Sequence, residues 1–112
     1  MCIRDRKVTI RDGRITRIHR AIPIDEAQGE YIGLAKFSTA GARTLREHYH
    51  RCRADYAGKP FREAKVFEKA YLILLFQEMI DRGVILTAVE TSGGYMEIDT
   101  QQDFDLARRF WR

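Results

Sequence analysis

The dipeptide Asp12-Gly13 is the local feature that most constrains the fold of this chain. Asp-Gly tolerates positive φ at both central positions of a two-residue turn, and such turns match the twist of antiparallel strands. β-branched residues flank the dipeptide on both sides, namely Val8, Ile10, Ile15 and Ile18. The sequence therefore predicts a β-hairpin over residues 7–19.

A nearly continuous apolar segment, residues 31–37, follows a loop around Pro23 to Gly29. Its length and composition are typical of a buried strand, in which Gly33 would mark a close backbone approach. Ser38 or Thr39 can then cap a helix over residues 40–56. Apolar side chains recur there at helical spacing: Ala42, Leu45, Tyr49, Cys52 and Tyr56.

Residues 63–82 predict a second helix, which ends at Gly83 because glycine readily adopts the left-handed conformation that closes a helix. It is the most hydrophobic helix, so we expect it to pack against a sheet. Residues 84–89 read as a buried strand. A turn at 92–94 leads into a short strand at 95–99, and the last helix is capped by Thr100 and carries Asp103, Phe104, Ala107 and Trp111.

The composition indicates one domain or a piece of one, since 112 residues with 45% hydrophobic side chains can bury a single modest core. No apolar run approaches the roughly 18 residues that a membrane span requires. Two distant cysteines and the absence of an apolar leader favour a reduced, cytoplasmic setting. We expect residues 1–6 to be a non-native leader and residues 7–112 to belong to the domain.

The candidate chemical site is the segment Tyr95 to Thr100. Side chains alternate along an extended strand, so Tyr95, Glu97 and Asp99 would share one face. Two carboxylates at this spacing can converge on Mg²⁺, which often takes one or two carboxylates together with substrate phosphates. The alternative is a solvated strand face, with Asp99 merely favourable beside the start of the last helix.

A family resemblance enters at these residues. Three strings in this order resemble the later half of nucleotidyltransferases, and specifically are similar to the phosphocholine and aminoethylphosphonate cytidylyltransferase group. They lie at 29–38, at 70–72 running into 77–83, and at 93–100 with Asp103 after it. The resemblance covers nearly everything from Val8 onward. It implies an α/β fold, the carboxyl-terminal half of a three-layer α/β/α, Rossmann-like domain with a mixed sheet.

The resemblance also implies a reaction. Mg²⁺ held by Glu97 and Asp99 would help the phosphate or phosphonate of a small acceptor attack the α-phosphorus of CTP, releasing pyrophosphate. Glu30 and the backbone of Gly33 would lie near the acceptor. Tyr95 would stand at the pocket edge, where its ring could attract an ammonium group. Lys36 lies on the predicted buried strand at 31–37. Its side chain either reaches phosphate at the end of that strand or extends its ammonium group to solvent.

Two departures from the family pattern limit this interpretation. The glycine-rich nucleotide loop and the earlier metal-binding aspartate of the family's first half have no counterpart here, so we expect the fragment alone to be inactive. Where relatives tend to carry Thr and Asp after Ala-Tyr-Leu, this chain has Ile73 and Leu74.

Other functions are less well supported. A sugar-1-phosphate nucleotidyltransferase would share the metal chemistry. A basic nucleic-acid-binding module would use Arg11, Arg14, Arg17, Arg20 and the helix at 43–53, but 20 Lys and Arg are interleaved with 16 Asp and Glu, so we expect neither nucleic acid nor membrane as a partner. A truncated sheet would leave an unpaired edge, which favours a homo-oligomer.

Overall fold

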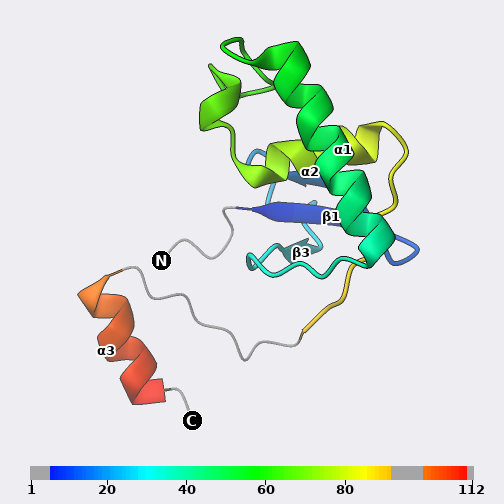
Figure 1. Cartoon of the computed structure of the whole chain (residues 1–112). Helices are drawn as coiled ribbons and strands as arrows, with labels where there is room; N and C mark the ends of the chain where they lie inside the picture. The colour runs from blue at the N-terminus through cyan, green and yellow to red at the C-terminus, as the bar shows by residue number, and fades with distance from the viewer. Residues whose placement is uncertain (1–5, 92–99, 111–112) are drawn as a thin grey trace.

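The computed structural model describes residues 6–91 and 100–110 (Figure 1). This part of the chain is a mixed α/β structure with a small antiparallel sheet and three α-helices. In chain order its elements are β1 (Lys7–Arg11), β2 (Arg14–His19), β3 (Gly29–Glu30), α1 (Thr39–Tyr56), the 3₁₀ helix η1 (Phe67–Lys69), α2 (Leu72–Asp81) and α3 (Gln101–Phe110).

The predicted hairpin is confirmed. β1 and β2 pair antiparallel, and the turn residues Asp12 and Gly13 have φ of 54° and 75°. The register shifts after Thr9, so Thr16 is an extra residue in β2. This bulge lets Ile15 and Ile18 both face the core although they are three positions apart in the strand.

The third strand is much shorter than predicted. β3 pairs with β1 only through Lys7↔Glu30 and Val8↔Gly29, and residues 31–38 have no regular secondary structure. The prediction of a buried strand at 31–37 is therefore wrong. Gly33 adopts φ +90°, which turns the chain out of the extended conformation, and Leu34 is 80% exposed.

Helix α1 confirms the predicted helix over 40–56. Ser38 is its N-cap, and the Ser38 hydroxyl accepts a hydrogen bond from the Gly41 amide at 3.0 Å. The helix ends at Tyr56, just before Gly58, which has φ +71°. Cys52 is its buried residue.

Helix α2 is shorter than the predicted helix over 63–82. The chain forms turns and η1 first, because Phe67 packs edge-on against Phe61 at a centroid distance of 5.5 Å, and the Phe67 amide bonds to the Lys59 carbonyl at 2.9 Å. These contacts hold residues 61–70 out of α-helical geometry. The predicted end of the helix at Gly83 is confirmed, since Gly83 adopts the left-handed conformation with φ +92°.

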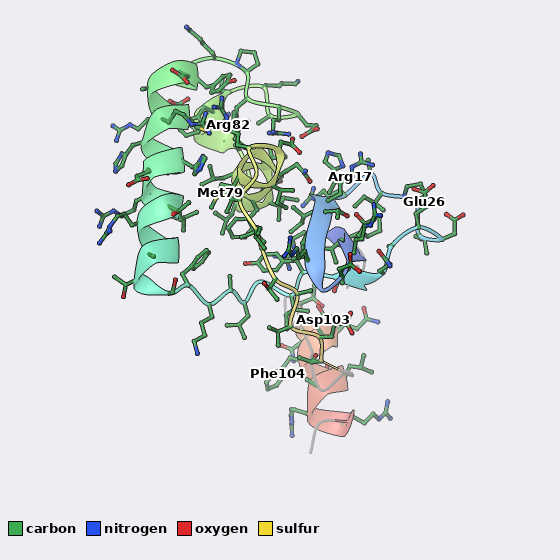
Figure 2. All side chains as sticks on the ribbon, turned by 90° about the vertical axis from the view of Figure 1, so that its right-hand side faces the viewer. Arg17, Glu26, Met79, Arg82, Asp103 and Phe104 are labelled. Carbon is green, nitrogen blue, oxygen red and sulfur yellow. The ribbon has the colours of Figure 1, made fainter. Side chains whose placement is uncertain are left out.

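As predicted, α2 packs on the sheet, where it contacts β2. The structure also packs α1 on α2. The helix α2 thus lies between α1 and the hairpin, with Met79 labelled in the interior (Figure 2). Seven consecutive residues of α2, Ile73 to Met79, are buried. The five apolar ones among them meet Val8, Ile18, Cys52 and Phe61 in one core cluster.

The predicted buried strand at 84–89 is wrong in extent. Only a single bridge, Arg14↔Thr87, is formed. The Ile15 amide bonds to the Leu86 carbonyl and the Ala88 amide to the Gly13 carbonyl, both at 2.8 Å. The segment therefore covers the first part of the outer edge of β2, which leaves less open edge for self-association than we expected.

Helix α3 lies apart from the other described elements (Figure 1). Thr100 caps it as predicted, since its hydroxyl accepts a hydrogen bond from the Asp103 amide at 3.1 Å. Asp103 and Ala107 are buried, whereas Phe104 is 43% exposed, and Trp111 lies outside the described residues. Within residues 6–91 and 100–110, no helix has the length and apolar character needed to cross a membrane.

Candidate functional site

The predicted site residues fall into two groups. Glu30, Gly33 and Lys36 lie in the described structure, whereas Tyr95, Glu97 and Asp99 lie outside the described residues. Glu30 is half-buried at the end of β3, and Gly33 and Lys36 are exposed on the loop that follows. The prediction that Lys36 sits on a buried-type strand is wrong because the strand ends at Glu30.

Two aromatic residues anchor the loop that carries Gly33 and Lys36. Tyr31 packs edge-on against Phe76 of α2 at a centroid distance of 5.8 Å, and Phe37 meets the same ring at 6.2 Å. The loop is therefore fixed at both ends to the core, with its middle presented to solvent. Positive φ, rather than a close backbone approach, is the reason for glycine at 33, since a Cβ there would meet its nearest neighbour, Arg6 Nη1, at an ordinary 3.6 Å.

The most developed polar group in the described chain surrounds Glu78 of α2. Three arginines from different segments bond to its carboxylate: Arg51 at 3.1 Å, Arg62 at 3.0 Å and Arg82 at 2.8 Å. Arg62 also pairs with Asp81 at 2.7 Å. We call Glu78, Asp81 and these three arginines the Glu78 cluster. It ties α1 and the loop before η1 to α2.

The cluster sets the charge state of its members. Burial alone would raise the pKa of Glu78, but hydrogen bonds from Arg82, Arg62 and Arg51 outweigh it, so the pKa lies below its ordinary value. Burial lowers the pKa of Arg62, but the hydrogen bonds to Asp81 and Glu78 and the charges of these two carboxylates together raise it by more, so the pKa lies above its ordinary value. Burial raises the pKa of the neighbouring Cys52 thiol, which therefore stays protonated and weakly nucleophilic.

An open pocket of about 600 Å³ adjoins the cluster, lined by Glu47, His48, Arg51 and Arg82. A second hollow of about 220 Å³ lies between the end of β2 and the start of α2. Its lining combines apolar residues with charged ones: Ala64, Tyr71, Ile73 and Leu74, and His19, Arg20, Glu63 and Lys69. Within this lining, His19 Nε2 lies 3.1 Å from Glu63 Oε1.

Metal-binding chemistry is limited in the described part. No group of three or more His, Cys, Asp or Glu residues within 6–91 and 100–110 could hold a metal ion. His48 and Cys52 share a helix face, but the ring nitrogen His48 Nδ1 is bonded to Arg51 at 2.9 Å and Cys52 is fully buried. Glu78 is committed to arginines. The predicted metal ligands, Glu97 and Asp99, lie outside these residues.

Sequence reasoning missed the Glu78 cluster. Its carboxylate and two of its arginines come from segments 27 and 16 residues apart, and no local pattern joins them. The one signal was Glu78 and Arg82, four residues apart on a helix and therefore neighbours on its surface.

Comparison with known proteins adds no further identification. The chain matches no family model, no curated protein and no solved structure.

Proposed function

We propose that this chain is the carboxyl-terminal half of a Mg²⁺-dependent nucleotidyltransferase that moves a CMP group from CTP to a small phosphorylated or phosphonate acceptor. The observation that carries the proposal is the segment Tyr95-Met96-Glu97-Ile98-Asp99-Thr100, which resembles the metal-binding segment of the phosphocholine and aminoethylphosphonate cytidylyltransferase group. Two carboxylates at alternate positions suit a hard divalent cation bound to phosphate.

Several local features support this proposal. Thr100 caps α3, so a helix begins directly after the acidic pair. Gly33, which follows Glu30 in the first resembling string, has the positive φ that glycine tolerates best. The string Gln77 to Gly83 contains the end of α2 and its glycine stop.

The proposal includes a larger fold than the described elements form. In the intact enzyme, an upstream half would supply the glycine-rich nucleotide loop and complete a three-layer α/β/α domain. Its added strands would extend the small antiparallel sheet into a mixed one.

Metal binding can be tested on this chain directly. Mn²⁺, as a paramagnetic substitute for Mg²⁺, should broaden the amide resonances nearest Glu97 and Asp99 in a ¹⁵N-labelled sample. Glu97→Gln with Asp99→Asn should abolish that broadening. Asp105→Asn, a matched loss of one exposed carboxylate on α3, should leave it unchanged. Broadening centred elsewhere in the chain would refute the metal assignment.

Catalysis requires the protein joined to its upstream half. Pyrophosphate release from CTP should be measured with phosphocholine, aminoethylphosphonate and glucose-1-phosphate as acceptors. We expect Mg²⁺-dependent turnover with one of the first two, and a loss of about 100-fold or more in Glu97→Gln, because the metal neutralises charge on the transferring group. Preference for glucose-1-phosphate would instead indicate a sugar nucleotidyltransferase.

A further inference from the structure

The open pocket beside the Glu78 cluster is lined by charged and polar side chains only: Glu47, His48 and Arg51 of α1, and Arg82 at the end of α2. Its volume of about 600 Å³ is in the range of small-molecule sites. Figure 2 shows Arg82 beside α1. A lining of this kind disfavours apolar ligands and selects a small, highly charged one.

The orientation of His48 follows from its contact with Arg51. Arg51 Nη2 lies 2.9 Å from His48 Nδ1, and a guanidinium group can only donate, so Nδ1 is the acceptor. The proton of the neutral ring is therefore on Nε2. His48 thus contributes a hydrogen-bond donor rather than an acceptor at its outer nitrogen.

The two arginines retain donors after their contacts with Glu78. Arg82 uses Nε for Glu78, and within the described residues its terminal nitrogens contact no acceptor; the side chain is 52% exposed. Arg51 uses Nη2 for both His48 and Glu78, while its Nη1 is buried and has no hydrogen-bond partner in the described structure. Because Nη1 is buried, Arg51 acts on the pocket mainly through its charge, carried by a side chain that is 26% exposed.

The charges of the cluster do not cancel. Three arginines face two carboxylates, Glu78 and Asp81, which leaves one positive charge within the Glu78 cluster. Glu47, at the pocket rim, opposes this charge. An anion in the pocket would therefore be attracted by Arg51 and Arg82 and repelled by Glu47.

We propose that this pocket is a binding site for a phosphate-type oxyanion, held by Arg82, Arg51 and His48. Charge-assisted hydrogen bonds from guanidinium to phosphate are strong, and a phosphate group carries more negative charge and more acceptor oxygens than a carboxylate. The site uses none of the residues assigned to nucleotidyl transfer, so it does not depend on that proposal.

The ligand class can be tested with the full chain by titrating inorganic phosphate, pyrophosphate and acetate at constant ionic strength, with ¹⁵N amide shifts as the readout. Shifts should centre on residues 47–51 and 82, and phosphate or pyrophosphate should bind at least about fivefold more tightly than acetate. The comparison of phosphate with pyrophosphate distinguishes a single oxyanion from a longer phosphate chain. Equal affinity for acetate, or shifts spread over all arginines, would overturn the proposal.

Two substitutions with opposite expected effects sharpen the test. Arg82→Gln should weaken phosphate binding about fivefold or more, whereas Glu47→Gln should tighten it about twofold because a repulsive charge is removed. Arg53→Gln and Asp55→Asn, exposed residues of α1 that do not line the pocket, are the matched controls and should change binding less.

The result from Glu47→Gln stands even if Arg82→Gln fails to fold, because Glu47 is not part of the Glu78 cluster. Unchanged or weaker phosphate binding in Glu47→Gln would overturn the proposed site. So would equal weakening by Arg82→Gln and Arg53→Gln, which would indicate attraction by the overall positive charge of the chain.

Discussion

Glu78 joins three segments of the described chain. Its side chain is 10% exposed and accepts hydrogen bonds from Arg51, Arg62 and Arg82, which come from α1, from the loop before η1 and from the end of α2. Removing one partner of a buried ion pair leaves the others desolvated and uncompensated. The cost of losing Glu78 therefore exceeds the net contribution of the pairs themselves.

We predict that Glu78→Gln lowers the free energy of unfolding by about 2–3 kcal/mol, because three guanidinium groups lose a buried charge partner. Urea denaturation followed by circular dichroism measures this change. Asp55→Asn, an exposed carboxylate on α1, is the control and should change stability by less than about 0.5 kcal/mol. Equal effects of the two substitutions would contradict the structural role of Glu78.

The lowered pKa of Glu78 also predicts a pH dependence. The folded pKa lies below the ordinary value of 4.5, so this carboxylate contributes stability that is fully present above about pH 4.5 and is lost as the pH falls through the folded value. Urea midpoints should therefore fall on acidification below pH 4.5, and by less in Glu78→Gln than in the parent chain. Parallel midpoint curves for the two proteins would refute the assignment.

At the scale of elements, side chains and neighbouring segments cover the outer edge of β2. Leu86 and Ala88 bond to the first part of β2 and its turn, and Gln77 Oε1 accepts from the Ile18 amide at 2.8 Å further along. The bulge at Thr16 makes this possible, because it directs the amides of both Ile15 and Ile18 outward. A strand edge whose amides are already hydrogen-bonded is less open to pairing with another chain.

Gln77 and Gln28 form a matched pair, because each side chain accepts a hydrogen bond from a strand amide. The Ile18 amide bonds to Gln77 at 2.8 Å and the Ile10 amide to Gln28 at 2.5 Å. Of the two glutamines, only Gln77 is buried. Gln77→Met should cost about 1–2 kcal/mol, because the Ile18 amide is left unsatisfied away from water. Gln28→Met should cost less, since water can replace the exposed acceptor. Urea denaturation and hydrogen exchange at Ile18 measure the difference, and equal costs would contradict this prediction.

The elements set by local chemistry were predictable from sequence. Asp12-Gly13 sets the turn by its own backbone preference, and Ser38 and Thr100 cap helices within three residues. The incorrect boundaries depend on distant contacts. Phe67 leaves α-helical geometry to pack against Phe61, and residues 84–89 pair with β2 at a single position. Hydrophobic periodicity carries no information about such partners.

At the scale of the whole molecule, the chain is more extended than its length requires. Its radius of gyration is 15.8 Å, whereas a compact domain of about 100 residues has a value of about 13 Å. The core lies among β1, β2, α1 and α2, and none of the described side chains of α3 belongs to it. In the sequence, the acidic pair at 97 and 99 falls between the segments that form this core and α3.

This distribution predicts that residues 100–112 are dispensable for the core. Their deletion should change the free energy of unfolding by less than about 1 kcal/mol, since the residues known to be buried in α3, Asp103 and Ala107, offer little apolar area. Leu74→Ala, which opens a cavity in the α2 core, should cost about 2–5 kcal/mol in the same urea assay. A deletion as costly as Leu74→Ala would mean that α3 packs on this core and stabilises it.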